Sequence, residues 1–334
     1  MTIELTTAEE TGDDAWDELV RRSDTGTYFH QRGVLEVVAE HSTTTLHRLI
    51  GYKGQQPIGL LPVFERSFGP ITMVFSPPPG RYIPGLGPLL VDADGMKRAK
   101  VERRNRRFID ACLDWLESEV APRYTRIVTV PGYMDPRPFS WAGFTVTPQY
   151  TYHVDLSSDE EAVMASFRKS LRNDLRRHRD GPYSIERGGP KDVDFILEHL
   201  RARHEAQGTS FSLTDEYALD LNRASGEEQF TVYIARVDGE RASGIISPRF
   251  DGTMHYWQGG GKPDVSLPIN DLLHWEVMRD GIRDGQQVYD LVGANTRRLC
   301  RYKSKFNPTL RTYYELERGN PLLTALAGLY KRVN

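Results

Sequence analysis

Two lysines and a tyrosine lie close together near the C-terminal end of the chain, in the segment Tyr302-Lys303-Ser304-Lys305-Phe306-Asn307. A fixed ammonium group can stabilise a carbonyl oxygen that gains negative charge during a reaction, and it can also hold a phosphate. The structural alternative is a surface strand whose edge is protected by lysine. We expect this segment to open a strand, with Lys303 and Lys305 facing opposite ways.

Positive charge is clustered in three segments, although the formal net charge of the chain is −3. A helix predicted over 159–180 has an apolar stripe that recurs every four residues, and its remaining surface is basic. The other two clusters cover 97–107 and 297–305. A solvated helix face is the plain interpretation of one such run, whereas three runs together indicate an anionic ligand such as phosphate, pyrophosphate or an RNA acceptor stem. The stripe is Val163, Phe167, Leu171 and Leu175; the basic residues include Arg168, Arg172, Arg176 and, in the last cluster, Arg298.

A glycine-rich segment, Tyr256-Trp257-Gln258-Gly259-Gly260-Gly261, is predicted to end a strand. Glycines at this point let a ligand approach the backbone. The next segment, Ser266-Leu-Pro268-Ile-Asn270, predicts a helix start with proline in its first turn, and free N–H groups at such a start bind anions. The structural alternative is an ordinary turn before a core helix.

Other sites with known sequence patterns are not found. The glycine segment is not followed by Gly-Lys-Ser/Thr, and no G-x-S-x-G nucleophile motif occurs. His204-Glu205 lacks the second histidine of a zinc helix, so we expect no metal. The absence of a candidate nucleophile fits transfer chemistry in which an amine of the substrate attacks directly.

The elements that carry these residues belong to an internal duplication. Residues 46–64 and 231–250 are both apolar runs joined by a glycine-containing polar turn, which is a hairpin pattern. Gly54 and Gly59 align with Gly239 and Gly244 without a gap. Thr72-Met73-Val74-Phe75 then matches Thr253-Met254-His255-Tyr256. A helix, a strand and a final strand follow in both halves, with 144–154 matching 306–316, so the sequence predicts two related modules.

Alternating strands and helices in each half predict an α/β (α+β) fold. We place the first module at 1–150, the second at 151–317 with the active site, and a helical tail at 318–334. The 39% hydrophobic and 27% charged residues suit a folded globular protein.

Cys112 and Cys300 have no partner at metal-ligand spacing, and two distant cysteines suggest a reducing compartment. The N-terminus lacks the pattern of a secretory signal. The longest apolar run, 321–330, is about half the roughly 20 residues of a spanning helix. We therefore expect a cytoplasmic protein without stable membrane insertion.

The second module resembles the FemAB family and its relatives, which include peptidoglycan-bridge aminoacyltransferases and GNAT proteins with a BioF2-like acetyltransferase domain. The resemblance lies in an ordered set of segments that covers about 150–316, and it extends loosely to the first module. In chain order these segments are 167–177, Tyr256-Trp-Gln-Gly-Gly, 267–275, Tyr289-Asp290-Leu-Val-Gly293 and Tyr302-Lys303-Ser-Lys-Phe306-Asn307.

The resemblance implies two tandem GNAT-like modules with mixed, mostly antiparallel sheets, and transfer of an acyl or aminoacyl group to an amine. The family's catalytic lysine maps onto Lys303, so Lys303, Tyr302 and Asp290 become the catalytic candidates. The residues expected to bind the donor or the acceptor are Arg168, Arg172, Arg176, Tyr256, Gln258, Gly259, Asn270 and Arg298. Asn307 replaces the family's usual glycine, and asparagine tolerates left-handed geometry.

The donor implied by the resemblance is acyl-CoA or aminoacyl-tRNA, which makes tRNA a candidate partner. The pyrophosphate motif Arg/Gln-x-x-Gly-x-Gly/Ala is only partly present, as Arg241-Ala-Ser-Gly244. The acceptor is the amine of a small molecule or of a cell-envelope or glycan precursor. The competing hypothesis is a non-catalytic module with a degenerate GNAT fold that binds an anionic polymer or RNA.

Overall fold

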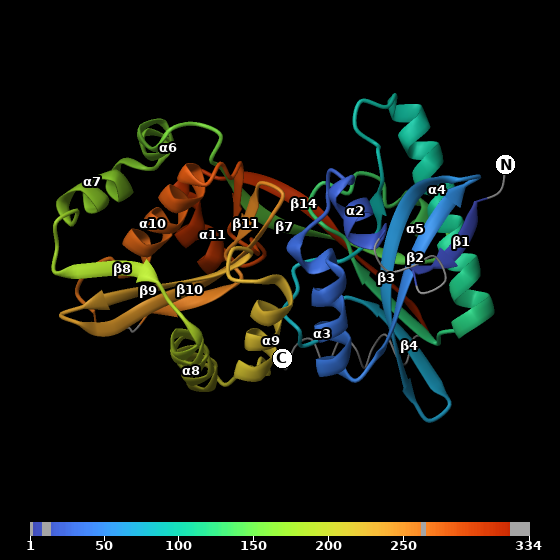
Figure 1. Ribbon diagram of the computed structural model, residues 1–334, viewed down its shortest axis with the longest axis horizontal. Helices are drawn as coiled ribbons and strands as arrows, with labels where there is room; N and C mark the ends of the chain where they lie inside the picture. Colours follow the sequence, from blue (N-terminus) through green and yellow to red (C-terminus); the bar gives the residue numbers. More distant parts are fainter. Residues whose placement is uncertain (1–2, 9–14, 262–264, 321–334) are drawn as a thin grey trace. The chain divides into compact units, whose positions relative to one another are not determined.

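The computed structural model describes residues 3–8, 15–261 and 265–320. The chain divides into two compact units (Figure 1). Unit 1 contains Met1–Gln149 and Thr312–Val333, and unit 2 contains Tyr150–Arg311. Two strands, β7 (Thr145–Asp155) and β14 (Thr309–Gly319), each contribute residues to both units. Residues 312–317, which the sequence assigned to the second module, thus fall in unit 1. Arg318 and Gly319 end strand β14, and 321–334 of the expected helical tail lie outside the described residues.

Unit 1 is built around a mixed sheet. Its strands are β1 (Glu4–Thr7), β2 (Thr45–Lys53), β3 (Gln56–Phe68), β4 (Ile71–Ser76), the short β5 (Leu89–Leu90), β6 (Tyr124–Val128), the first part of β7 and the second part of β14. Neighbours in the order β1-β2-β3-β4 are antiparallel, β4 and β6 are parallel, and β6 and β14 are antiparallel. The helices are α2 (Ala15–Arg21), α3 (Arg32–Ser42), α4 (Arg98–Trp115) and α5 (Arg137–Trp141).

Unit 2 repeats this topology. Its strands are β8 (Tyr183–Arg187), β9 (Phe230–Val237), β10 (Glu240–Phe250), β11 (Thr253–His255), β12 (Gln258–Gly261), β13 (Val288–Asp290) and the second part of β7. Strands β8-β9-β10-β11 are antiparallel neighbours, β11 and β13 are parallel, and β13 and β7 are antiparallel. The predicted duplication of hairpin plus strand is therefore confirmed, as is the α/β fold class.

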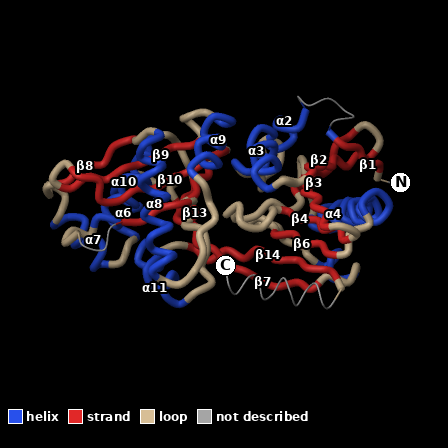
Figure 2. The backbone as a smooth tube through the Cα atoms, turned by 90° about the horizontal axis from the view of Figure 1, so that it is seen from below, coloured by secondary structure: helices blue, strands red, loops and turns tan. Residues whose placement is uncertain are grey.

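The helices of unit 2 cover both faces of its sheet (Figure 2). They are α6 (Glu160–Ser166), α7 (Lys169–Arg177), α8 (Pro190–Ala206), α9 (Asp215–Ser225), α10 (Ile269–Arg283) and α11 (Arg297–Lys303). Adjacent residues of β10 show which helix lies on which face. A Cβ atom on Gly244 would lie 2.4 Å from the Ile196 side chain of α8, whereas the Ser243 hydroxyl donates to Asn270 of α10 at 2.7 Å. Because neighbouring strand residues point to opposite faces, α8 and α10 lie on opposite sides of β10.

The gapless sequence alignment of the two hairpins is shifted by one residue relative to the positions of their turns in the structure. Lys53 pairs with Gln56, which makes Gly54 the first residue of its two-residue turn. Val237 pairs with Glu240, which makes Gly239 the second residue of its turn. Both glycines have positive φ, 60° and 82°, and glycine adopts such angles at little steric cost. Gly59 therefore faces α4 in unit 1, while the aligned Gly244 faces α8.

The final strands are exchanged relative to the prediction. We expected 144–154 to complete the first module and 306–316 to complete the second. Instead, Val154 of β7 pairs with Tyr289 of unit 2, and Leu316 of β14 pairs with Ile127 of unit 1. Each sheet is completed by the strand that the sequence assigned to the other module, and the similar apolar patterns of the two segments give no sign of this exchange.

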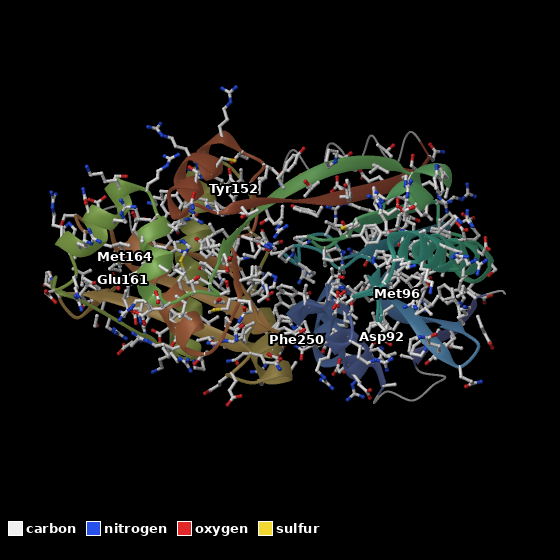
Figure 3. The ribbon with its side chains drawn as sticks, turned by 90° about the horizontal axis from the view of Figure 1, so that it is seen from above. Asp92, Met96, Tyr152, Glu161, Met164 and Phe250 are labelled. Atoms are coloured by element: carbon white, nitrogen blue, oxygen red, sulfur yellow. The ribbon has the colours of Figure 1, made fainter. Side chains whose placement is uncertain are left out.

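The expected single helix over 159–180 is two helices, α6 and α7, separated at Phe167–Arg168. Asp159 caps α6 by accepting from the Ala162 N–H at 2.8 Å. The predicted apolar stripe is confirmed, because Val163, Phe167, Leu171 and Leu175 are all buried in the core of unit 2. Met164 of α6 packs against the same core, with Glu161 beside it on the helix (Figure 3).

No helix among the described residues has both the length and the apolar composition needed to cross a membrane.

Candidate functional site

The sheet of unit 2 divides beyond His255. Strand β11 pairs with β10 on one side and with β13 on the other, and the Tyr256 N–H still donates to Asp290 O at 2.8 Å. Strand β12 then continues along β10 alone. The chain after β13 follows β7 instead: Leu291 N donates to Tyr152 O at 2.8 Å. Strand β12 and residues 291–294 therefore diverge at this point. We call this point of divergence "the fork".

The side of β12 away from β10 faces the fork, and no described strand pairs with it. Glycine is required in β12, because a Cβ atom would lie 2.5 Å from the Arg203 guanidinium at Gly260 and 2.9 Å from the Tyr256 ring at Gly259, and Gly260 has a φ of 146°. Gln258 is buried in β12, and the Tyr256 hydroxyl donates to Gly259 O at 2.9 Å. Asn270, in the first turn of α10, accepts a hydrogen bond from the Ser243 hydroxyl of β10. Tyr256, Gln258, Gly259 and Asn270, all predicted from the sequence, therefore lie around the fork.

Lys303 reaches the opposite side of the fork from α11. The helix begins after Thr296, whose side chain caps it by accepting from Leu299 N. The ε-amino group of Lys303 donates to Val292 O at 2.6 Å and to Gly293 O at 2.8 Å, and the residue is only 3% exposed. These carbonyls can turn toward Lys303 because Val292 and Gly293 have φ angles of 48° and 84°. An ammonium has three N–H donors, so one remains after these two bonds.

Burial lowers the pKa of Lys303 from 10.5 to about 8, and the negative charge of Asp290 partly opposes that shift. The group is therefore mostly an ammonium at neutral pH, and it loses its proton under mildly alkaline conditions.

The expected strand at 302–307 is wrong. Lys303 ends α11, and Ser304–Phe306 form one 3₁₀ turn that ends at Asn307 with a φ of 51°. Asparagine thus adopts the left-handed geometry expected of it. Lys305 does not face away from the site: its Nζ donates to Asp271 Oδ1 at 2.5 Å and lies 3.9 Å from the centre of the Tyr302 ring. Both lysines nevertheless lie near aromatic rings, since the ring centre of Tyr256 is 5.8 Å from Lys303 Nζ and that of Tyr302 is 3.9 Å from Lys305 Nζ.

These aromatic side chains form the wall behind Lys303. The His274 ring lies 4.6 Å from Tyr256, 6.0 Å from Tyr302 and 5.3 Å from Phe306, measured between ring centres. Tyr302 donates to Asp271 Oδ1 at 3.0 Å, and burial raises the pKa of its phenol. Both Tyr302 and Asp271 therefore hold Lys305 in place and shape this wall.

His274 is part of this wall, and our sequence analysis missed it. Burial, helped by the charges of Lys303 and Lys305, lowers its pKa to about 3. The imidazole is therefore neutral, and its Nδ1 lies 3.0 Å from the Tyr289 hydroxyl. A single histidine within the apolar pattern of a helix resembles any core histidine, so the sequence held no signal for this position.

Asp290, a predicted catalytic residue, shapes the loop that Lys303 binds. Its Oδ1 accepts from Thr151 Oγ1 at 2.5 Å and from Val292 N at 2.8 Å. Burial raises its pKa, but His153, whose Nε2 lies 3.6 Å from Oδ2, contributes to a net lowering. The carboxylate is ionised, and it holds residue 292 in the conformation that presents a carbonyl to Lys303.

The predicted basic residues do not converge on the fork. Arg172 donates to Ala165 O at 2.7 Å and to Phe167 O at 2.8 Å, so it caps the C-terminal end of α6. Arg168 donates through its backbone N–H to Lys305 O at 2.9 Å. The side chains of Arg168, Arg176 and Arg298 are exposed. Within the described residues no hydrogen bond or ion pair links these four side chains to Lys303.

Among the described residues no group of three or more histidine, cysteine, aspartate or glutamate side chains is arranged to hold a metal ion.

The comparisons with known proteins concern the second unit and the fold. Residues 165–304 match the family model described as "Acetyltransferase (GNAT) domain". No curated protein sequence matches the chain. The crystal structure of FemX is similar with a TM-score of 0.72 at 12% identity, over 94% of this chain and 97% of that one.

Two further structures share the fold over most of their length. The C-terminal domain (DUF2156) of a putative lysylphosphatidylglycerol synthetase from Agrobacterium fabrum has a TM-score of 0.59 at 16% identity, over 94% of this chain and 93% of that one. L-PGS from Bacillus licheniformis has a TM-score of 0.52 at 13% identity, over 90% and 95%. At these identities the likeness establishes the fold. The segment that matches the GNAT model contains Tyr256, His274, Asp290 and Lys303.

Proposed function

We propose that this protein, whose second unit is a GNAT acetyltransferase domain, transfers an acyl or aminoacyl group to an amine at the fork of unit 2. One observation carries the proposal: Lys303, within the GNAT segment, places a buried ammonium at the fork with one N–H donor left unused. Low exposure strengthens its interaction with a charge that develops on a substrate, because little water screens it.

The proposed reaction needs no enzyme nucleophile. The acceptor amine attacks the carbonyl carbon of a thioester or ester, which forms a C–N bond and places negative charge on the carbonyl oxygen. Lys303 donates its remaining hydrogen bond to that oxygen. Collapse of the intermediate breaks the C–S or C–O bond, the amine loses a proton, and the leaving thiol or hydroxyl gains one. Asp290 acts as a positioning residue through the loop at Val292.

Acyl-CoA and aminoacyl-tRNA remain the two donor classes. The family match favours acyl-CoA in general, whereas the fold shared with FemX supports an aminoacyl donor. The edge of β12 that no described strand pairs with suits either, since an extended acyl chain can lie along a strand edge. For the acceptor we propose the amine of a small molecule or of an envelope precursor. Both donors are cytoplasmic molecules, so we propose that the reaction takes place there.

A second candidate function is non-catalytic binding of an anionic polymer. The observation that favours it is the exposure of Arg168, Arg176 and Arg298, which lie on α7 or its N-cap and on α11. Such a binder needs a broad basic surface but no buried lysine at a fork.

Native mass spectrometry of the purified chain tests the proposal. We expect one-to-one binding of either acetyl-CoA or an aminoacyl-tRNA, and transfer of the donor's acyl group when amines are added. Binding of uncharged tRNA or of unrelated RNA with equal strength, without transfer from any donor, would support the polymer-binding function instead.

A further inference from the structure

The chain after β13 bulges away from β7. Leu291 N donates to Tyr152 O at 2.8 Å, and Ala294 N donates to Tyr150 O at 2.7 Å. The two donors are three residues apart in the sequence, whereas the two acceptors are only two apart, so one extra residue lies on the side of Leu291. Residues 292 and 293 form this bulge, and their carbonyls are the two that accept from the lysine of the proposed active site.

Two buried side chains bind the N–H groups of the bulge. Val292 N donates to Asp290 Oδ1 at 2.8 Å, and Gly293 N donates to Thr151 Oγ1 at 3.1 Å. The Thr151 hydroxyl in turn donates to Asp290 Oδ1 at 2.5 Å. Thr151 and Asp290 are each 2% exposed, and the hydroxyl acts as donor and acceptor at once. We call these three hydrogen bonds the clamp.

The clamp maintains a backbone conformation that the residues themselves do not favour. Val292 has a φ of 48°, which a β-branched residue rarely adopts. Such a conformation persists only where the surroundings over-determine it. Both residues of the bulge meet this condition, because the clamp binds their N–H groups while Lys303 Nζ binds their carbonyls at 2.6 and 2.8 Å.

Thr151 is the member of the clamp that no sequence motif indicated. It lies on β7, before the segment 165–304 that matches the GNAT model, whereas Asp290 and the bulge lie within that segment. Without its hydroxyl, Gly293 N would lose its acceptor and Asp290 Oδ1 would lose one of its two donors. Unpartnered polar groups in a buried place are costly, so the bulge would move to find other partners.

We propose that Thr151 is a positioning residue for Lys303: its hydroxyl fixes the two carbonyls that orient the ammonium toward the fork. The consequence for transfer rests on the proposed function, whereas the effect on the bulge does not. The position needs a side chain that donates and accepts a hydrogen bond in the same small space. Serine meets this requirement, and valine, which has the shape of threonine, does not.

Hydrogen–deuterium exchange at single-residue resolution tests the clamp without any donor. In Thr151→Val we expect the Gly293 amide to exchange at least about tenfold faster than in the wild type, because its acceptor is gone. Thr151→Ser should restore most of the protection. Thr145→Val replaces an exposed threonine of the same strand and should exchange at Gly293 as the wild type does.

Transfer kinetics test the consequence for Lys303. With the donor that the wild type uses, we expect kcat of Thr151→Val to be about ten- to a hundredfold lower and KM to change less than about twofold, since a misplaced charged group mainly affects the transition state. Thr151→Ser should recover most of the rate, and Thr145→Val should keep the wild-type rate. Circular dichroism melts establish that each variant is folded, and Thr151→Ala is the second variant if Thr151→Val is not.

The proposal is wrong if the folded variants without the hydroxyl protect the Gly293 amide as the wild type does, if they transfer with the wild-type kcat, or if Thr151→Ser is as slow as Thr151→Val. If the wild type transfers from no donor, the proposed function fails, and the exchange of the Gly293 amide alone then decides whether Thr151 fixes the bulge that holds Lys303.

Discussion

Replacing Lys303 with methionine is expected to lower the single-turnover rate of acyl transfer by about 10²–10³-fold, the usual cost of losing one charged group that stabilises an oxyanion. Methionine has a similar length but cannot donate a hydrogen bond. Lys303→Arg should recover only part of the rate, because a planar guanidinium cannot occupy the place of an ammonium held between Val292 O and Gly293 O.

The neighbouring Lys305 is not a suitable control for this experiment. Lys305 contacts Asp271 and Tyr302, so Lys305→Met would disturb the same site. Lys191 is a better choice, since it is exposed in the first turn of α8. We expect Lys191→Met to transfer at the wild-type rate. We also expect Lys303→Met to melt near the wild-type temperature, because the burial cost of an ammonium is removed while two carbonyls lose their donor. Transfer by folded Lys303→Met at the wild-type rate would mean that the active site lies elsewhere.

The second large effect is on the pH dependence of transfer. The proposed role requires the ammonium form of Lys303, whose pKa is about 8 because the group is buried. Below this value the group is protonated, and above it the fraction in the active form falls tenfold per pH unit. We therefore expect kcat/KM, corrected for the fraction of neutral acceptor amine, to decline as pH rises through about 8, and the decline should disappear in Lys303→Arg, since arginine stays protonated.

The measurement is kcat/KM between pH 6 and 10 with the cognate donor, for both proteins. A rise in wild-type kcat/KM through the same pH that is absent in Lys303→Arg would show that neutral Lys303 acts as a base that takes the amine's proton. A profile that is the same in Lys303→Arg would remove Lys303 from the chemistry altogether.

The duplication and the fold class were predictable because strand hairpins leave a local pattern. Glycine at a turn and alternating apolar residues locate β2–β3 and β9–β10 without any long-range information. The alignment failed by one residue at the turn itself, since Gly54 and Gly239 occupy different positions of their turns. A one-residue shift reverses which helix a strand residue faces, and only the pairing in three dimensions shows it.

The exchange of β7 and β14 was not predictable for a related reason. Pairing partners of a strand are non-local, and the two segments have similar patterns. The break between α6 and α7 was also missed, because Phe167 continues the apolar stripe while its backbone leaves the helix, with a ψ of 159°. The basic residues form a cluster in the sequence and their predicted binding role stays a prediction, but only the structure shows that Arg172 caps α6.

The site residues predicted from the ordered set of segments gave the most information about where the fork lies. Tyr256, Gly259, Asn270 and Lys303 surround the fork, although Lys303 lies on a helix and not on the expected strand. His274 and Asp271 could not be distinguished from ordinary residues of α10 by sequence. Their importance comes from what packs against them, namely Tyr302 and Lys305.

Donor binding at the fork can be measured by hydrogen–deuterium exchange of the intact chain with and without donor, using acetyl-CoA and an aminoacyl-tRNA in separate experiments. We expect one of them to slow exchange at residues 256–261 and 291–303, on the two sides of the fork, because a bound acyl group covers these backbone amides. Slowed exchange only at other segments, or no change with either donor, would contradict the claim that this protein binds its donor at the fork around Lys303.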